Sequence, residues 1–352
     1  MISKKIGVVK EILKETLEVE EVIVDINGVD YKAYNYPKMT GNLSVEDEVL
    51  LNTTAVELSL GTGGYHFVIA NLNNMESDLT PGGHIMKLRY TPMQIKVDAV
   101  EEQESLYHNK INDFKSLDDM PVVVGGLHSM LVPFACTFKK NKPNKKLIYI
   151  MTDGASLPIY LSQAVSELKE KGLISDTITV GNAFGGDYEC VNIYTALITA
   201  KEVLNADCVF VSMGPGIAGT GTKYGFTGIE QGPILDAVHK LGGMPILIPR
   251  VSFGDKRSRH VGISHHTLTV LNDIVNVPVN VVFNIVDKEK EELIKAQIED
   301  NKITDKHRVV YLKNNDVHKN IKEFNMKVKT MGRGYEQDKE FFDCAGGASL
   351  LV

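Results

Sequence analysis

The densest group of residues that could bind a ligand lies in a glycine-rich loop behind a short apolar segment. The segment DCVFVSM (207–213) has strand character, and GPGIAGTGTKYGFTGIEQG (214–232) follows it with seven glycines. Glycine permits positive φ angles and lets the backbone approach a ligand closely. Free N–H groups at the end of a strand form a natural anion site. The residues expected to contact such an anion are Gly214, Gly216, Gly219, Thr220, Gly221, Thr222 and Lys223.

This loop matches two nucleotide-binding motifs only in part. Its first six residues satisfy G-x-G-x-x-G after a strand, but the helix that a dinucleotide site requires does not follow at once. The run from Gly216 to Lys223 has the spacing of a P-loop with lysine and threonine exchanged. The loop is therefore expected to bind a phosphate or a carboxylate through N–H groups, two hydroxyls and one ammonium. The alternative is a purely structural loop or lid.

Two carboxylates also follow expected strands. Asp153 comes directly after LIYIMT, and Asp187 stands in GNAFGGDYECVN after TITV. Carboxylates at such positions hold Mg²⁺ or act as bases, but Asp is equally favoured as a helix N-cap. The functional hypothesis pairs Asp153 with Asp187 around a divalent cation such as Mg²⁺, with both residues in catalytic roles.

A basic, histidine-rich segment follows the expected strand MPILIP. It is SFGDKRSRHVGISHHT (252–267), with two arginines and three histidines within ten residues. Arg257 and Arg259 suit bidentate contacts to a phosphate or carboxylate. The histidines could be metal ligands or general acid/base groups, with His260 or His265 transferring a proton. Adjacent histidines on a helix point in different directions, so at most one of His265 and His266 is expected to reach a given centre. A mobile basic surface loop is the alternative.

From Pro121 onward, apolar strands alternate with amphipathic helices. The strand candidates are PVVVGG, LIYIM, TITV, DCVFVSM, MPILIP, VNVVF and RVVYL, with KVKT less clear, and the helices between them are expected over 128–138, 155–171, 187–204, 232–241, 266–275, 287–299 and 316–324. Continuous apolar strands between helices indicate a mostly parallel sheet covered on both faces. We therefore expect an α/β, Rossmann-like domain over 121–352, with ligands at the carboxyl ends of its strands.

The first part of the chain has a different pattern. Residues 1–72 contain short β-rich runs without a long helical pattern, and Asn27-Gly28 is a strong hairpin signal. A small β-barrel-like domain is the simplest arrangement of these runs. Residues 73–120 are expected to connect the two domains. They include a strand around HIMKLRYT whose basic residues, Lys87 among them, are most simply explained as a solvated face.

Composition limits the class of protein. A net charge of −7 argues against a general nucleic-acid binder. The four cysteines are widely spaced and form no C-x-x-C, so reduced thiols are expected rather than a zinc ribbon or a disulfide framework. The N-terminus carries charges and no signal-peptide core, and no apolar run is long enough to span a bilayer. The protein is predicted to be cytoplasmic, without a membrane partner.

Five segments together carry a resemblance to a known family. They are KLRYTPMQ (87–94), MTDGASLP (151–158), GNAFGGDYECVN (181–192), GPGIAGTGTKYGFTGIEQG (214–232) and MGRGYEQD (331–338). With them the chain resembles, over nearly its whole length, a bacterial family catalogued as a domain of unknown function. The resemblance implies a cytoplasmic bacterial protein and transfers no activity, cofactor or catalytic residue.

These features lead to three functional hypotheses. The first is an enzyme that binds a phosphorylated or otherwise anionic small molecule at the glycine-rich loop. The second is a ligand sensor or assembly scaffold without turnover, and the third gives the β-barrel an RNA or protein partner. The small residues near the C-terminus, in DCAGGASLLV, suit either close internal packing or a subunit interface in a homo-oligomer.

Overall fold

The computed structural model describes every residue except Thr62. The chain forms two compact units, Met1–Gly82 and Gly83–Val352. The sequence places the end of the first domain near residue 72, whereas the structure divides the chain between Gly82 and Gly83. Each unit has its own hydrophobic core and is described separately.

The first unit is a closed five-stranded barrel. Its strands are β1 (Lys4–Glu15), β2 (Glu20–Ile26), β3 (Val29–Asn35), β4 (Glu48–Asn52) and β5 (Tyr65–Asn71), in the order β1-β2-β3-β5-β4. Short helices α1 (Pro37–Thr40) and α2 (Thr54–Glu57) lie between strands. The predicted hairpin joins β2 to β3, with positive φ angles at Asn27 (55°) and Gly28 (84°). Alternate strand residues such as Val22, Val24 and Leu51 fill the interior.

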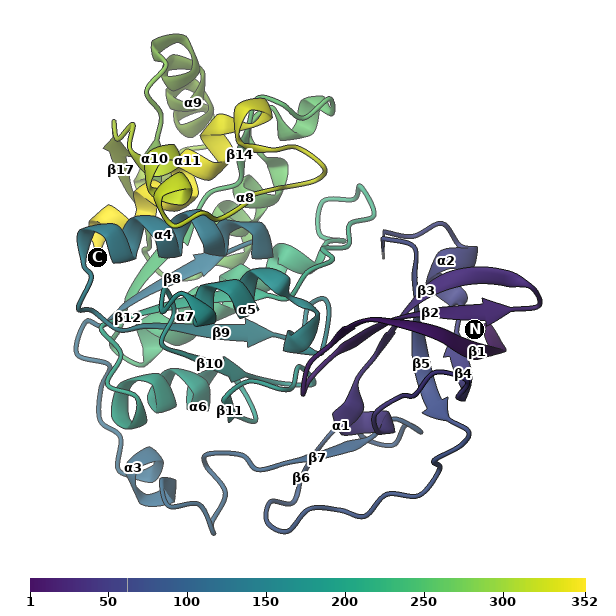
Figure 1. The fold of residues 1–352 in the computed structure, drawn as a ribbon. Helices are drawn as coiled ribbons and strands as arrows, with labels where there is room; N and C mark the ends of the chain where they lie inside the picture. The colour runs from purple at the N-terminus through teal and green to yellow at the C-terminus, as the bar shows by residue number, and fades with distance from the viewer. Residues whose placement is uncertain (62) are drawn as a thin grey trace. The chain divides into compact units, whose positions relative to one another are not determined.

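The second unit is built on an eight-stranded sheet (Figure 1). Its strands are β8 (Pro121–Gly125), β9 (Leu147–Thr152), β10 (Asp176–Thr179), β11 (Tyr188–Glu189), β12 (Cys208–Met213), β13 (Met244–Ile248), β16 (Asn280–Asn284) and β17 (Arg308–Leu312). All of them pair in parallel, in the order β11-β10-β9-β12-β8-β13-β16-β17. The carboxyl ends of these strands therefore meet at one edge of the sheet.

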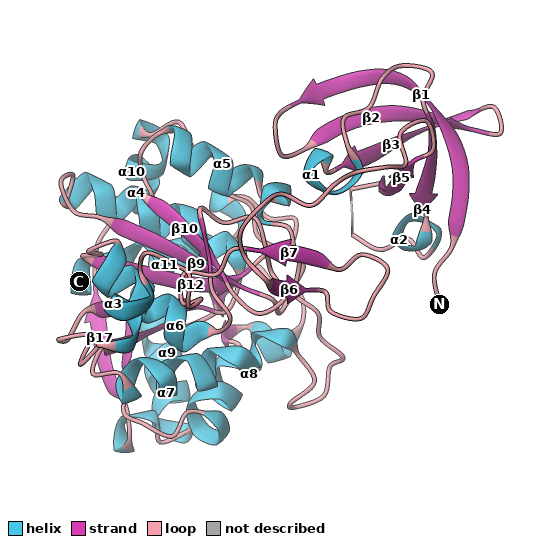
Figure 2. Ribbon diagram, turned by 90° about the horizontal axis from the view of Figure 1, so that it is seen from below, coloured by secondary structure: helices cyan, strands magenta, loops and turns pink. Residues whose placement is uncertain are grey.

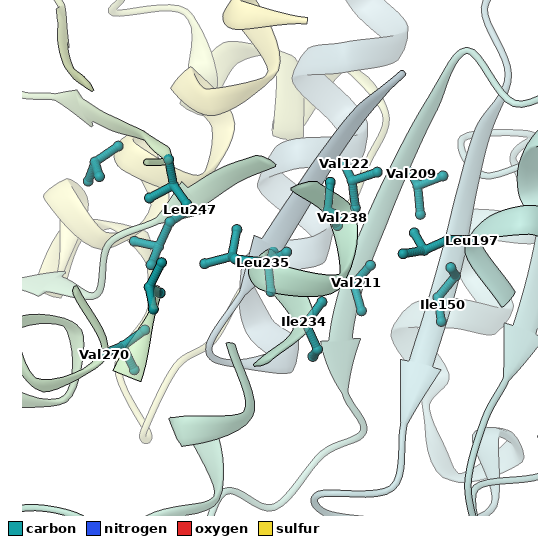
Figure 3. Close-up of a cluster of buried hydrophobic side chains, with 14 of the residues drawn as sticks. Val122, Ile150, Leu197, Val209, Val211, Ile234, Leu235, Val238, Leu247 and Val270 are labelled. Atoms are coloured by element: carbon teal, nitrogen blue, oxygen red, sulfur yellow. The ribbon is translucent and has the colours of Figure 1, made fainter. Parts of the chain in front are cut away.

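Helices cover both faces of this sheet (Figure 2). They are α4 (Leu131–Asn141), α5 (Gln163–Glu170), α6 (Ile193–Ile198), α7 (Gln231–Lys240), α8 (His265–Thr269), α9 (Lys288–Asp300), α10 (Val317–Glu323) and α11 (Lys339–Gly347). Successive residues of one strand enter opposite cores, since Val122 and Val124 join one cluster and Val123 joins the other. Figure 3 shows the first cluster, in which Val209 and Val211 of β12 and Leu235 of α7 are drawn. The α/β class and the additional barrel predicted from the sequence are confirmed.

Two predicted helices begin later than expected. The loop after β9 continues through a short 3₁₀ turn (Ile159–Leu161), and α5 starts at Gln163 with the Ser162 hydroxyl as its cap. In the stretch 187–204, Tyr188 and Glu189 form β11 before α6 begins. The KVKT candidate is not assigned as a strand in the structure.

The segment after Gly83 is an integral part of the second unit. It forms a small hairpin of β6 (Ile85–Lys87) and β7 (Ile95–Val97), followed by α3 (His108–Asn112). Lys87 is only 1% exposed, and its ammonium contacts Glu189. The expected solvated face is therefore wrong for Lys87, because a carboxylate and two carbonyl groups surround this ammonium away from water.

The small-residue C-terminal end packs inside the chain. A Cβ atom on Gly346 would lie 2.5 Å from Val317 of α10, and one on Gly347 would lie 2.5 Å from Asn284 of β16. Glycine is thus required for the close approach of α11 to these elements. The four cysteines are buried and unpaired, in agreement with the expectation of reduced thiols.

Candidate functional site

The glycine-rich loop joins two parts of the carboxyl edge of the sheet. A Cβ atom on Gly214, directly after β12, would lie 2.6 Å from the carbonyl oxygen of Ser156 in the loop after β9. Further along, such an atom on Gly219 would lie 3.8 Å from His266, and one on Gly221 would lie 4.0 Å from the Arg259 guanidinium. The structure therefore brings together the two segments, 214–223 and 257–266, that the sequence marks separately as candidates for anion binding.

The exposed backbone of this loop carries N–H groups that are available as hydrogen-bond donors. Gly216 and Gly221 have positive φ angles of 103° and 81°. In the part of the chain that the structure describes, the N–H groups of Gly216, Gly219 and Gly221 donate no hydrogen bond. Exposed, unpaired N–H groups on an irregular loop are suitable donors to an anion.

The polar side chains of the loop are already engaged. The hydroxyls of Thr220 and Thr222 are 2.9 Å apart, and Thr222 accepts from the Gly225 N–H at 3.1 Å. Lys223 forms a 2.9 Å ion pair with Asp273. These three side chains stabilise the loop in this structure, so an anion would have to displace their partners to use them.

Three histidines gather beside the loop. His260 ends a short 3₁₀ turn (Ser258–His260), and His265 and His266 begin α8. Each offers one ligand nitrogen, and these three nitrogens lie within 4.8 Å of one another. The expectation that only one of the adjacent pair reaches a common centre is wrong. Both rings are at the first positions of α8, with centroids 4.3 Å apart, and His260 meets both from the preceding loop.

The surroundings of this cluster keep the imidazoles neutral. Burial, together with Arg250 and Arg257, lowers the pKa of His260 to about 3. Burial and the neighbouring His265 lower the pKa of His266 to about 3, and burial and Arg259 lower that of His265. A general acid or base works best with a pKa near the operating pH. His260 is therefore poorly suited to transfer protons at neutral pH.

Asp255 organises the arginines around the histidines. This buried carboxylate accepts from Arg257 at 2.7 and 2.9 Å and from Arg250 at 3.3 Å, and Arg333 lies 3.5 Å away. Hydrogen bonding from Arg257 holds the pKa of Asp255 well below its usual range. Arg257 is thus committed to Asp255, whereas Arg259 is exposed and, among the described residues, forms no hydrogen bond or ion pair.

Asp153 has a partner that the sequence did not indicate. Glu230 accepts from the Thr152 hydroxyl at 2.5 Å, beside the end of β9. Burial raises the pKa of Glu230 to about 7, against the lowering effect of Thr152, and the charge of Asp153 adds to the rise. Asp153 itself accepts from the Asn182 N–H at 2.8 Å. A buried carboxyl group that titrates near neutral pH, as Glu230 does, is a suitable general acid or base.

Asp187 lies elsewhere. It accepts from the N–H and hydroxyl of Thr177, at the start of β10, and pairs with Lys169. Burial opposes its ionisation, but these hydrogen bonds outweigh burial and lower its pKa. Asp153 is bonded beyond the other end of β10, at Asn182. The structure therefore does not bring Asp153 and Asp187 together around one cation, because they are bound at opposite ends of that strand.

Sequence reasoning missed Glu230 and Asp255. Glu230 ends the glycine-rich loop, four residues after Phe226, and only the tertiary fold shows that it reaches β9. Asp255 precedes a cluster of basic residues, a charge pattern that could have identified it. His266 was named together with His265, but only one of the two was expected to reach a given centre, whereas the structure groups both with His260.

Replacing Glu230 by glutamine is expected to stabilise the protein above neutral pH. The native carboxyl has a raised pKa, so the native state binds more protons than the unfolded state between about pH 4.5 and 7. Stability is therefore lost as pH rises through that range, and Glu230→Gln should recover about 3 kcal/mol at pH 8 and little at pH 4. Urea unfolding at both pH values measures this, with the exposed Glu167→Gln as the matched control. Equal effects at pH 4 and 8 would contradict the assignment.

The fold and the site define a two-unit α/β protein with a Rossmann-like sheet, a small β-barrel and a polar site at the carboxyl edge of the sheet. The chain belongs to the family described as "Protein of unknown function (DUF3866)", whose model matches residues 32–349. This confirms the resemblance to a family catalogued as a domain of unknown function. No curated protein matches the sequence. Among the described residues, no helix is both long and apolar enough to cross a membrane.

Proposed function

We propose that this protein is an enzyme that binds a phosphorylated or otherwise anionic small molecule between the glycine-rich loop and Arg259. The observation that carries the proposal is the approach of Gly221 to the Arg259 guanidinium, with unpaired N–H groups on the loop. Arginine and backbone N–H donors together bind phosphate and carboxylate oxygens well. Gly214, Gly216 and Gly219 place further backbone around the same anion.

In this proposal, residues at the other end of the loop transfer the proton. The loop starts beside Ser156 and ends at Glu230, so an anion held at Gly221 is bound by the element that carries Glu230. Asp153 and Glu230 form the acid–base pair, since burial, with the charge of Asp153 adding to it, raises the pKa of Glu230 to about 7. A ligand sensor without turnover would use the same anion contacts but would not require Glu230.

Arg259→Ala tests the anion site. In this proposal the guanidinium supplies charge-assisted hydrogen bonds, and their loss is expected to weaken binding about 10-fold or more. A thermal-shift screen with inorganic phosphate, pyrophosphate, nucleotides, sugar phosphates and dicarboxylates identifies a ligand, which raises stability by about 2.7 kcal/mol at a hundred times Kd. Calorimetry then compares the wild type with Arg259→Ala.

The matched control is Arg308→Ala, which removes an exposed arginine from β17. It should leave the affinity unchanged. A screen in which none of these anions shifts the melting temperature, or an equal loss in both variants, would overturn the proposal. If a hit is found, product formation from it distinguishes an enzyme from a sensor.

An RNA or protein partner at the barrel receives weaker support. The outer face of β3 and β5 carries stacked Tyr34 and Tyr65 rings 4.1 Å apart, with Lys32 5.5 Å from the Tyr65 ring. Aromatic platforms of this kind bind single-stranded nucleic acids when a basic groove accompanies them. Here the Tyr65 hydroxyl donates to Glu21 on β2, so an acidic group lies beside the aromatic pair.

A further inference from the structure

We propose that His260, His265 and His266 form a binding site for a transition-metal ion of the zinc type. Their ligand nitrogens lie within 4.8 Å of one another. Nitrogen ligands about 2.0–2.1 Å from a tetrahedral Zn²⁺ lie about 3.4 Å from each other, so side-chain rotations that draw the three rings together would complete the coordination. This proposal concerns the metal alone and does not rest on anion binding at the loop.

Unpartnered nitrogen atoms are the first argument for a ligand here. Nε2 of His265 and Nδ1 of His266 are buried and have no hydrogen-bond partner. Most buried polar side-chain atoms have such a partner, and each exception requires an explanation. Two such atoms on neighbouring rings, both in a three-histidine cluster, are explained together if a metal ion is their partner.

The chemistry of the ligand set selects the kind of ion. Within the described part of the chain, the group consists of three imidazoles and no carboxylate. Imidazole suits zinc, copper, iron and nickel, whereas Mg²⁺ and Ca²⁺ prefer oxygen ligands. Three protein ligands also leave a coordination position open, as in zinc sites that bind water or a substrate. The site is therefore distinct from the Mg²⁺ site that the sequence suggested at Asp153 and Asp187.

The surrounding structure supports the ligands as a metal site requires. Nδ1 of His260 is hydrogen-bonded to the Ser264 hydroxyl at 2.7 Å, which fixes the ring and leaves Nε2 available. The Ser264 N–H donates to the Arg250 carbonyl oxygen at 2.8 Å, so the support is itself anchored. Phe226 stacks on His266.

The nearby arginines would repel a divalent cation if they were not neutralised. Asp255 accepts hydrogen bonds from Arg250 and Arg257, and Arg333 pairs with both Asp255 and Asp338. Most of this positive charge is therefore balanced by carboxylates within the same network. Arg259 remains unbalanced, and it favours a negatively charged group at the open coordination position of the ion.

Metal titration of the full-length chain tests the site. After treatment with a chelator, in buffer without phosphate or carboxylate, the wild type is expected to bind about one Zn²⁺ per chain. His260→Ala, His265→Ala and His266→Ala should each weaken binding by more than about 100-fold, beyond the 10–100-fold typical of an outer-shell partner. Ser264→Ala should fall within that smaller range. His239→Ala, which removes an exposed histidine from α7, is the matched control and should change nothing.

A second measurement avoids variants that fail to fold. X-ray absorption of the wild-type Zn²⁺ form counts the imidazole ligands directly, and three are expected. Mg²⁺ should not compete for the site. Failure of the wild type to bind Zn²⁺, fewer than three imidazoles in the absorption spectrum, or an equal loss in the His239→Ala control would overturn the assignment. Since no anion is present, these outcomes leave the anion proposal to its own test.

Discussion

Asp255→Ala is expected to destabilise the protein by about 3–5 kcal/mol, the cost typical of removing one partner from a buried ion pair. Asp255 is 6% exposed and contacts three guanidinium groups. Arg250, itself 5% exposed, would lose its carboxylate partner and remain as a buried, unbalanced charge. Burial already lowers the pKa of Arg250 to about 10 with Asp255 in place. Urea unfolding near pH 7 measures the change.

Asp273→Ala is the matched control for this variant. Asp273 pairs with Lys223 at 2.9 Å, but both side chains are partly exposed. Exposed ion pairs contribute about 0–1 kcal/mol, so this change should be small. A loss of less than about 1 kcal/mol for Asp255→Ala would contradict the organising role of Asp255.

The effect of pH on the stability of the region around Asp255 follows from the same contacts. The folded pKa of Asp255 is depressed, so its contribution is present above the unfolded value of about 3.9 and is lost as pH falls further. The histidines act at higher pH. Their folded pKa values are also lowered, so the unfolded state binds more protons below about pH 6.5 and stability falls from there. Acid therefore weakens this region in two stages.

The fold was largely predictable because local and long-range signals agree. Segments such as CVFVSM are predominantly apolar and are buried at every position, which fits a strand whose alternate residues enter two cores. The chain then has to cover both faces with the intervening helices. The late starts of α5 and α6 were less predictable, since apolar residues in 155–162 and in β11 pack in non-helical conformations.

The candidate site was predictable only where strand ends determined position. The loop after β12 and the segment after β13 both follow strands whose carboxyl ends share one edge of the sheet, and Gly219 and His266 lie close together there. Asp187 also follows a strand in the sequence, but its chain turns back to the beginning of β10. Glu230 reaches Thr152 across 78 positions, and no local pattern encodes that contact. Side-chain partners of this kind depend on the assembled fold.

Lys87→Met is expected to destabilise the second unit by about 3–5 kcal/mol, as for other buried pairs that lose one partner. The Lys87 ammonium lies 2.6 Å from Glu189 and donates to the carbonyl groups of Thr179 at 3.1 Å and Ala183 at 2.5 Å. Methionine would fill the space of the side chain but satisfy none of these acceptors. Lys145→Met, which removes an exposed lysine paired with Asp207, is the matched control and should cost less than about 1 kcal/mol.

A double-mutant cycle with Glu189→Gln separates the ion pair from the packing of the lysine stem. A coupling energy of about 0.5–3 kcal/mol is expected for groups in direct contact. Proteolysis between residues 88 and 94 provides a second measurement, because loss of the anchor should release the β6–β7 hairpin before the unit unfolds globally. Unchanged cleavage together with unchanged stability would contradict the anchoring role.

The Lys87 anchor also affects the position of Asp153. Directly after Lys87, Leu88 and Tyr90 have positive φ angles of 51° and 60°, conformations that side chains other than glycine rarely adopt. In that turn the Leu88 N–H donates to the Asn182 side chain, and the Asn182 N–H donates to Asp153. Lys87 holds the strained turn in place. This turn orients Asn182, which positions Asp153. Lys87→Met should therefore reduce any Asp153-dependent activity even at temperatures where the variant remains folded.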